Sequence, residues 1–579
     1  MWKRSSITTI YATIVVAALL LFFTNTAAAA AATQSIATPI PVVGVKTGID
    51  KKTGQPPPRL DINDLYARGG PQWDLYILAL SQMQNQNETE ETSFFSIAGI
   101  HGHPHTSWNG VEHVDGAPYS GFCPHGELLF ATWHRPYVAL FEQILVANAQ
   151  LISLTYPPSL RPAYISAAQT LRQPYWDWAL SPFPILPPAV TYPNLTVISP
   201  LTGQAQTIDN PLYQYKFQRP RLIKSWGGHL SSHSNHTLRC INSGDDDYSD
   251  SDDEGNNATA SNENLRDRAR GLSEYVYDIF TRVTTFDEMK TTTFETPHNM
   301  IHAYAACDGT LSDLNWAGFE PLFMLHHANI DRLLALWQTI WYNNNTTDNS
   351  NNNSDASNMF TGTDISKGQF ATPKGTIISA SSPLKPFFQQ DGISFHTSNS
   401  VQNWYGFGYT YPELPPLGID EERGAEWVRA EVNSLYGPGK TGDKDGVSRI
   451  GGGEGKKVVV EVSVNRKEFM GKKGRIGFFD MGGRDVGEVV VMNMPCEGEL
   501  REVIPLTGGK IEDGILEVGV WFEEEEEIDV GRIKSLNITI WGMEYLPGRG
   551  NSGFPIFDER RERLGVEVRG RKKGEREST

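Results

Sequence analysis

One histidine pair constrains the fold of this 579-residue chain more than any other feature. His298 and His302 stand four residues apart in a helical pattern, so their imidazoles share one helix face, about 6 Å apart. A second helical pattern over residues 323–334 places His327 and Asp331 on one face. An imidazole from that helix would complete a three-nitrogen metal site with open coordination positions. The fold must therefore bring the two helices together around the histidines.

Three further histidines lie upstream, at His101, His125 and His134. The step from His125 to His134 corresponds to about 900° of helix rotation, which would place them on opposite faces of one helix. We therefore expect His125 on a loop and His134 at the start of a helix over residues 136–152. Two three-histidine sets imply two metal ions.

The all-imidazole donor sets narrow the choice of metal. Neutral imidazole suits copper, zinc, iron and nickel, whereas binuclear hydrolases usually recruit carboxylates as bridging ligands. The predicted ligands in both sets are all histidines. The pattern favours a copper pair that cycles between Cu(I) and Cu(II), and a zinc hydrolase is the weaker alternative.

Composition excludes several classes of protein. The chain has 39% hydrophobic and 11% aromatic residues, enough for a large core, so it is not wholly disordered. Its 50 basic and 68 acidic residues give a net charge of −18, which argues against a nucleic acid or an anionic membrane as partner. Four cysteines cannot form a disulfide scaffold in a chain of this length. We expect Cys240, Cys307 and Cys496 to be unpaired or structural.

The amino terminus resembles a secretion signal. Lys3 and Arg4 precede an apolar run over residues 7–23 and an alanine tract over 27–32, which predicts a signal peptide over residues 1–32. An uncleaved anchor is the alternative, and only then do we expect contact with a membrane. Glycosylation sequons support entry into the secretory pathway, at Asn87, Asn194, Asn235, Asn257, Asn344 and Asn537. The expected destination is secreted, cell wall or vacuolar.

Composition also predicts the domain organisation. Residues 39–412 are rich in Trp, Tyr, Pro and His and carry helical patterns, so we expect a mainly α domain whose helical-bundle core holds the histidines. Two polar insertions, over 231–264 and 343–358, are expected to be solvated loops. Residues 413–420 are typical of a linker.

The remainder of the chain has a different pattern. A helical segment over 421–435 precedes β-rich runs separated by Gly-rich turns, which predicts a β-sandwich-like C-terminal domain over 421–558. Residues 559–579 are densely charged and are expected to form a disordered tail. The predicted strands cover residues 458–464, 475–479, 487–492 and 536–541.

Together these motifs resemble the type 3 copper family of tyrosinases, catechol oxidases and hemocyanins, and fungal tyrosinases most closely. The resemblance covers residues 39–412 and is carried by Ile97–His101, Cys123-Pro-His125, Trp133-His-Arg-Pro-Tyr137, Pro174–Trp178, His298–His302 and Leu325–Arg332. It implies that one copper is bound by His101, His125 and His134, and the other by His298, His302 and His327. The same pattern leaves His326 outside the ligand set.

The resemblance also implies roles for neighbouring residues. Cys123 would form a thioether bond to His125, and Leu314 would be a gate over one copper. Glu295 and Asn299 would hold a water that accepts the proton of a monophenol. A helix N-terminus alone also favours a glutamate at position 295, so a purely structural role stays open.

Four further residues lie near the predicted ligands without belonging to them. Glu320 replaces the aspartate usual in the family, so we expect the hydrogen bonding around His302 to differ. We expect His103, His105 and His113 to lie outside the ligand sets.

Tyr409 and Tyr411 match the motif that closes the catalytic domain in the family. The C-terminal domain would then cover the site until an activating protease trims the chain near Tyr411, which makes the chain a latent proenzyme. An aromatic residue would fill the substrate position, with Phe469, Phe478 and Phe479 as candidates.

The implied activity is that of a tyrosinase. With O2 and two copper ions, it would hydroxylate monophenols at the ortho position and oxidise o-diphenols to o-quinones, feeding melanin-type pigment formation. A catechol or o-aminophenol oxidase without monophenol activity is one alternative. A hemocyanin-like O2 carrier is another.

Overall fold

The computed structural model describes residues 38–180, 184–226, 235–240, 256–269, 271–290, 294–341, 359–438, 455–507, 514–522 and 526–571. The predicted signal peptide and the predicted loop over 343–358 lie outside these ranges. Residues Pro39–Thr579 form one compact unit. Within the described ranges, every helix is too short or too polar to cross a membrane.

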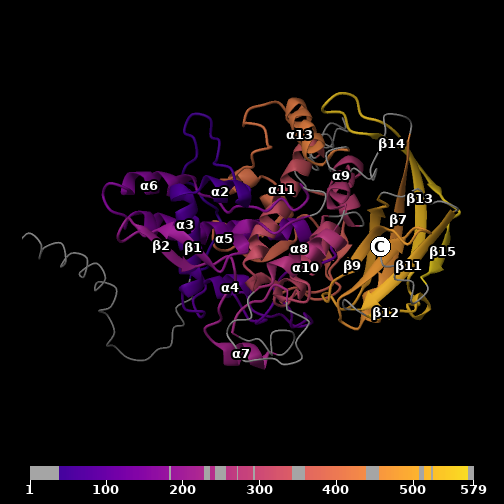
Figure 1. Ribbon diagram of the computed structural model, residues 1–579, viewed down its shortest axis with the longest axis horizontal. Helices are drawn as coiled ribbons and strands as arrows, with labels where there is room; N and C mark the ends of the chain where they lie inside the picture. The colour runs from indigo at the N-terminus through magenta and orange to yellow at the C-terminus, as the bar shows by residue number, and fades with distance from the viewer. Residues whose placement is uncertain are drawn as a thin grey trace, which may run out of the picture. The chain divides into compact units, whose positions relative to one another are not determined.

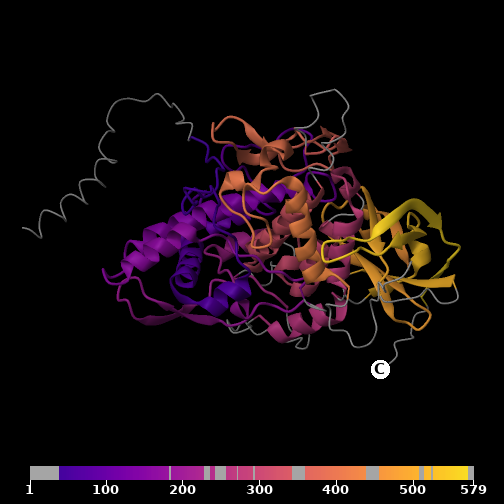
Figure 2. The ribbon, with the colours of Figure 1, turned by 90° about the horizontal axis from the view of Figure 1, so that it is seen from above.

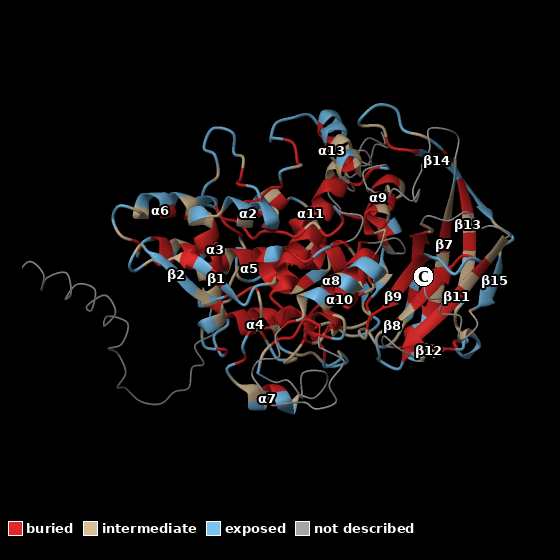
Figure 3. Ribbon diagram, viewed as in Figure 1, coloured by how far each residue is buried: buried red, intermediate tan, exposed pale blue. Residues whose placement is uncertain are grey.

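Long buried helices build the part of the fold that carries the histidines (Figure 1). Helix α5 (Phe130–Ser153) packs against α3 (Gly70–Asn85) and α11 (Leu322–Trp341), and α11 also contacts α10 (Glu295–Ala306). Figure 3 shows α5, α10 and α11 largely in the colour of buried residues. Helices that are apolar on most faces belong in the centre of a bundle, and these carry the histidine motifs there.

Shorter elements surround this core. The remaining helices of this part are α2 (Ile62–Arg68), α4 (Phe94–Ala98), α6 (Arg161–Thr170), α7 (Pro220–Ser225), α8 (Ala258–Arg268), α9 (Leu272–Arg282) and α12 (Ser398–Val401). Three antiparallel hairpins pair β1 (Asn194–Ile198) with β2 (Ala205–Asp209), β3 (Asp364–Ile365) with β4 (Ile377–Ile378), and β5 (Pro383–Phe388) with β6 (Phe395–Thr397).

Two sheets form the C-terminal part of the fold, seen in orange and yellow in Figures 1 and 2. One has the order β10–β7–β13–β14, from β7 (Gly455–Asn465), β10 (Glu499–Pro505), β13 (Asn537–Leu546) and β14 (Ile556–Arg563). The other has the order β12–β11–β8–β9, from β8 (Gly474–Phe479), β9 (Asp485–Val491), β11 (Ile515–Phe522) and β12 (Glu526–Ile528). The predicted fold class, a helical core followed by a β-sandwich-like domain, is confirmed.

Two expectations about segment boundaries are wrong. The charged tail is paired as far as Gly570, because β14 pairs with β13 and β15 (Glu567–Gly570) pairs with β11. Its exposed charged side chains suit an edge strand, where water solvates them while the backbone bonds to the sheet. The insertion over 231–264 is also not wholly a loop, since α8 begins at Ala258 with Asn257 as its N-cap.

Helix α13 (Glu421–Tyr436) packs on the helical core. Its contacts are with α11 and α9, and its buried face includes Val428, Val432 and Tyr436. The helix that follows the predicted linker is therefore attached to the histidine-bearing helices.

A disulfide joins Cys240 to Cys307, across 67 residues of sequence. Of the two roles expected for these cysteines, unpaired or structural, Cys240 and Cys307 have the structural one. Their pairing with each other was not predicted, because pairing depends on spatial proximity that sequence spacing does not reveal. Cys307 directly follows α10, so the bridge fixes the end of the helix that carries His298 and His302. Cys123 is a buried free thiol and Cys496 an exposed one.

Candidate metal centre

The structure gathers the six histidines that the sequence singles out into one buried cluster. His101 and His125 come from loops, and His134 lies on α5. Helix α5 begins at Phe130, earlier than predicted, so His134 lies in its second turn and Pro136 lies inside the helix. The other three come from α10 and α11. The rings of His134 and His327 have centroids 4.2 Å apart, so the two predicted sets adjoin each other.

Backbone carbonyls orient three of the imidazoles. The Nδ1 atoms lie 3.0 Å from the carbonyl of Leu314 for His101, 2.8 Å from that of Phe130 for His134, and 2.7 Å from that of Leu311 for His302. A carbonyl only accepts, so each Nδ1 carries the proton and each Nε2 keeps a free lone pair. Second partners of this kind are typical of histidines that bind a metal.

Inside the cluster, imidazole nitrogens from different helices and loops converge. The Nε2 atoms of His302 and His327 are 3.3 Å apart. Those of His101 and His298 are buried without a hydrogen-bond partner among the described residues. Burial lowers the pKa of His134 to about 3 and that of His302 to about 4, so both are neutral at neutral pH. Converging unsatisfied imidazole nitrogens fit a bound cation, and copper is among the metals that this donor set suits.

Ligand atoms close enough to share an ion fall into overlapping groups. They comprise His298, His302, His326 and His327; His101, His134 and His327; and His101, Cys123 and His125. His326 is as deeply buried as His327 and stacks on His298 at 4.9 Å between ring centroids. The choice of His327 over His326 as ligand stays a prediction.

Cys123 lies against the first histidine set. Its Sγ is 3.4 Å from Nε2 of His125 and 3.3 Å from Nε2 of His134. Burial raises the pKa of this thiol, and Glu295 and Glu127 raise it further. The sulfur is therefore close enough to an imidazole for the predicted thioether bond, and it contacts two histidines where the sequence motif pointed to one.

Glu295, the first residue of α10, is buried and attached to the loop that carries His125. Both of its carboxylate oxygens accept the N–H of Gly126 at 2.8 Å. Burial raises the pKa of Glu295, and the cations of Arg466 and Lys367 oppose that shift. Gly126 has φ of +68°, a left-handed backbone conformation that favours glycine at this turn.

Asn299 has a different contact from the one expected. Its Oδ1 lies 3.0 Å from Nδ1 of His298, so in this structure it orients a predicted ligand. Its role beside Glu295 in holding a water stays a prediction. Glu320, which was expected to affect the hydrogen bonding around His302, accepts a hydrogen bond from Nε of Arg239 at 3.2 Å. The Nδ1 of His302 bonds to the carbonyl of Leu311.

The two tyrosines of the closing motif converge on Asp331, one helical turn after His327. The hydroxyls of Tyr409 and Tyr411 donate to Oδ2 of Asp331 at 2.6 and 2.7 Å. Arg135, the neighbour of His134, donates to Oδ1 at 2.6 Å, and Arg59 donates to Oδ2 at 3.0 Å. The carboxylate thereby ties α5 to α11 beside the cluster.

Residues of the C-terminal part approach the cluster at two points. Asn493 accepts the N–H of Leu314 at 3.2 Å, and the carbonyl of Leu314 is the group that orients His101. Arg466, buried at the end of β7, faces Glu295. Neither residue is predicted from the sequence, because neither belongs to a motif and only the folded chain brings them near the histidines.

The aromatic candidates for the substrate position have partners inside the C-terminal part. Phe469 packs against Phe522 at 5.2 Å between ring centroids, and Phe479 packs against Trp521 at 5.8 Å. Phe478 is fully buried in β8. A blocking role for any of the three stays a prediction.

The extra histidines form aromatic stacks. His103 stacks on His105 at 4.3 Å and on Trp226 at 5.4 Å, and His113 stacks on Tyr119 at 4.0 Å. None of the three belongs to a group of described residues close enough to share an ion.

Comparisons with known proteins agree with this centre. The family model "Common central domain of tyrosinase" matches residues 91–340. The solved structure of recombinant mushroom tyrosinase covers 92% of this chain and 99% of its own, with a TM-score of 0.74 and 21% identity. The apo-protyrosinase melB of Aspergillus oryzae covers 93% and 98%, with a TM-score of 0.67 and 22% identity. These two likenesses concern the fold.

Relatives that are similar in sequence show the family to which the chain belongs. A tyrosinase of Neurospora crassa is 31% identical over 417 residues, which are 68% of this chain and 58% of that protein. A tyrosinase of Podospora anserina is 31% identical over 418 residues, which are 68% of both chains. Because that identity extends over two thirds of each protein, the chain belongs to the tyrosinase family of type 3 copper proteins, which are oxidoreductases.

Proposed function

We propose that the chain is a tyrosinase that hydroxylates monophenols and oxidises o-diphenols to o-quinones, for a melanin-type pigment. The observation that carries the proposal is the buried histidine cluster with Glu295 fixed beside it through Gly126. A carboxylate in that position can accept a proton near the metals, which the hydroxylation of a phenol requires.

The protein's own groups supply positioning and proton transfer. His101, His125 and His134 would hold one copper, and His298, His302 and His327 the other. When bound, the copper pair supplies the electrons and the Lewis acidity for oxidation of a phenol by O2. Glu295 would take the phenol proton through a water, and its bond to the Gly126 N–H keeps its oxygens in place. The carbonyls behind His101, His134 and His302 keep each Nε2 turned inward.

The intact chain is proposed to be latent. Asn493 and Arg466 bring the C-terminal part against Leu314 and Glu295. Glu502 of β10 accepts a hydrogen bond from Thr296 at the start of α10. These contacts support a cover over the centre that an activating protease would have to remove. The similar structures from Aspergillus oryzae are of pro-tyrosinases, which is in line with this proposal.

Passage through the secretory pathway belongs to the same proposal. It rests on the signal-like N-terminus and on exposed sequon asparagines, among which are Asn87, Asn194 and Asn537. We propose that the protein is secreted, bound in the cell wall or vacuolar.

One observation favours a second candidate, an oxidase of o-diphenols alone. The Oδ1 of Asn299 is engaged with His298, and holding a water beside Glu295 would draw on that same side chain. The two activities separate in one experiment, which is O2 uptake by the copper-loaded chain cut after Gly437, first with a monophenol and then with an o-diphenol. Uptake and quinone formation with both support the tyrosinase. Uptake with the diphenol alone supports the second candidate, and no uptake with either contradicts both.

A further inference from the structure

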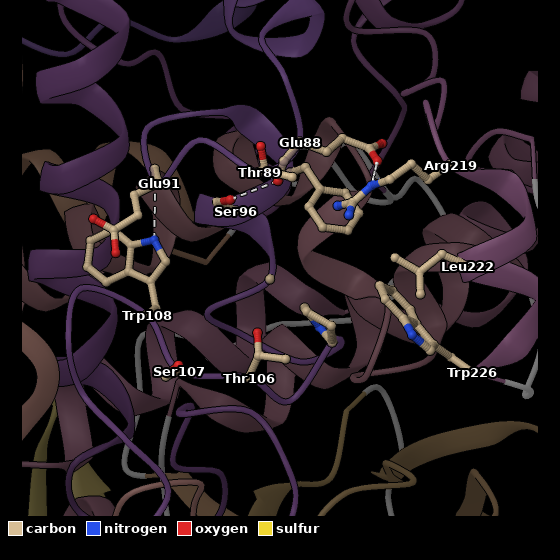
Figure 4. Close-up of a pocket in the computed structure, with 13 residues that line it drawn as sticks. Glu88, Thr89, Glu91, Ser96, Thr106, Ser107, Trp108, Arg219, Leu222 and Trp226 are labelled. Carbon is tan, nitrogen blue, oxygen red and sulfur yellow. Dashed lines mark hydrogen bonds and ion pairs between the residues drawn. The ribbon is translucent and has the colours of Figure 1, made fainter. Parts of the chain in front are cut away.

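A pocket of about 430 Å³ opens beside α4 and α7, within the usual size range of ligand sites. Phe95 is one of its aromatic lining residues. Figure 4 shows two more, Trp108 and Trp226, together with the charged side chains of Glu91 and Arg219. Thr106 and Ser107 add hydroxyls at the same rim. A sugar ring has C–H faces that pack on aromatic rings and hydroxyl edges that bond to polar groups, so this wall suits a carbohydrate.

A glycosylation sequon forms part of this pocket. Glu88 and Thr89, the second and third residues of Asn87-Glu88-Thr89, line it. Asn87 is exposed, and its Oδ1 accepts the Thr89 N–H at 3.0 Å and the Thr89 hydroxyl at 2.9 Å. Its Nδ2, the atom that carries the sugar in a glycoprotein, donates no hydrogen bond within the described part of the chain.

We propose that Asn87 carries an N-linked glycan and that its inner sugars dock in this pocket. In the attachment step the Asn87 amide nitrogen displaces a polyprenyl diphosphate from C1 of the reducing-end N-acetylglucosamine. The N–C1 bond forms as the C1–O bond breaks, and the amide proton leaves with the diphosphate. The inference rests on the proposed passage through the secretory pathway.

The pocket wall is preorganised on the side of the sequon. The buried carboxylate of Glu88 pairs with Nε of Arg219 at 2.8 Å, and it accepts the Tyr215 hydroxyl at 3.0 Å and the Gln218 N–H at 2.7 Å. These bonds attach the sequon turn to the start of α7. On the far side Trp226 stacks on His103, so one face of its indole is already held. A rigid wall loses little entropy when a ligand binds.

Because the glycan would be attached at the rim of the pocket, even weak contacts between its sugars and the pocket can hold it there. A ligand on a short tether has an effective concentration in the millimolar range, so a sugar site too weak to bind free sugar would still be filled. Three of the four other described sequons, at Asn194, Asn257 and Asn537, serve for comparison. The fourth is at Asn235, whose carbonyl accepts the N–H of Phe217, and Phe217 packs on Phe95 of the pocket, so it is not used as a control. Asn257 uses its side chain to cap α8, and Asn194 and Asn537 begin strands on exposed positions away from the residues that line this pocket. The last two are internal controls.

The test uses the full chain secreted from yeast, with site-specific mass spectrometry and digestion by endoglycosidase H under native conditions. We expect Asn87 to be occupied, and its glycan to be released about tenfold more slowly than that on Asn194 or Asn537, a ratio equivalent to about 1.4 kcal/mol. Trp226→Ala should abolish the difference without changing occupancy. Trp427→Ala, a matched change on the exposed face of α13, should preserve it.

Several outcomes would overturn the inference. An empty Asn87 beside an occupied Asn194 or Asn537 would do so, as would equal release rates in the unchanged chain, or slow release that persists in Trp226→Ala. Empty sequons throughout would instead remove the premise of secretion and leave the proposed enzyme activity untouched. A second pair of variants tests the inference even if Trp226→Ala does not fold. Thr89→Ala, which loses the sequon, should speed hydrogen exchange over residues 222–226, and Thr89→Ser, which keeps it, should not.

Discussion

Nη1 of Arg332 donates a hydrogen bond to the hydroxyl of Tyr436 at 2.9 Å, across 104 residues of sequence. Arg332 lies on α11, five residues after His327, and Tyr436 ends α13. The same guanidinium pairs with Glu413 at 2.7 Å and with Asp177 at 3.2 Å. The segment that follows the closing motif is thus bonded to the helix of a predicted copper ligand.

This relationship predicts where the chain can be cut. A chain that ends at Tyr411 loses both Glu413 and Tyr436, which leaves the buried Arg332 with a weakened set of partners. We expect it to be less stable than a chain that ends at Gly437 by about 3–5 kcal/mol, the usual cost of breaking a buried ion pair. Thermal unfolding of the two chains measures the difference. Equal midpoints would contradict the structural role of α13, and Arg423→Ala on its exposed face serves as a neutral control.

Asp331 predicts a pH-dependent contribution to stability. Burial alone would raise its pKa, but Arg135 and Arg59 outweigh burial and the pKa is lowered. A carboxylate with a lowered pKa stabilises the fold above its unfolded-state pKa, near 4, and this contribution is lost as the pH falls through the folded-state value. Asp331→Asn should therefore destabilise the protein strongly at pH 7, and the gap between the two proteins should narrow on acidification. Urea unfolding at several pH values tests this, and a constant gap would contradict it.

Glu295→Gln should separate the hydroxylation of monophenols from the oxidation of o-diphenols. Without a proton acceptor, the monophenol rate should fall by roughly two to four orders of magnitude, while the diphenol rate stays close to that of the unchanged chain. The measurement is initial O2 uptake by the copper-loaded chain cut after Gly437. Parallel loss of both activities with full copper content would mean that Glu295 serves only to hold the loop of Gly126.

Asn299 should act on metal affinity through His298. Asn299→Leu removes the acceptor for Nδ1 of His298, so we expect copper affinity to fall by roughly 10–100-fold. Asn299→Asp keeps an acceptor at that position and should retain most of the affinity. Copper titration against a competing chelator measures both. Unchanged affinity in the leucine variant would show that His298 needs no such support.

Arg466 should contribute to latency. Arg466→Ala removes the buried cation that faces Glu295 from the C-terminal part, so we expect the intact chain to gain several-fold in monophenol turnover. Arg466→Lys keeps the charge and should stay latent. The control is Arg501→Ala, which breaks an exposed ion pair with Glu461 in the same sheet. Intact chains that all remain equally inactive would exclude Arg466 as part of the cover.

The sequence predicted those features that short-range spacing determines. The four-residue spacing of His298 and His302 predicts one helix face, and α10 carries both. A run rich in valine, bounded by Gly-rich turns, predicted β7, since β-branched residues favour strands. Features that depend on contacts between residues far apart in the sequence could not be predicted. The Cys240–Cys307 bridge, the bond of Arg332 to Tyr436 and the approach of Arg466 to Glu295 all join residues that only the folded chain brings together.

Because Cys240 and Cys307 are joined, the number of free thiols in the chain indicates whether the thioether bond at the candidate metal centre has formed. With two of the four cysteines joined, Cys123 and Cys496 are the remaining thiols. Denatured without reductant, a chain with no thioether exposes two reactive sulfurs, and a chain in which Cys123 has bonded to an imidazole exposes one. A thiol-counting dye can therefore follow maturation of the centre in a mixed preparation, without a copper assay or a substrate.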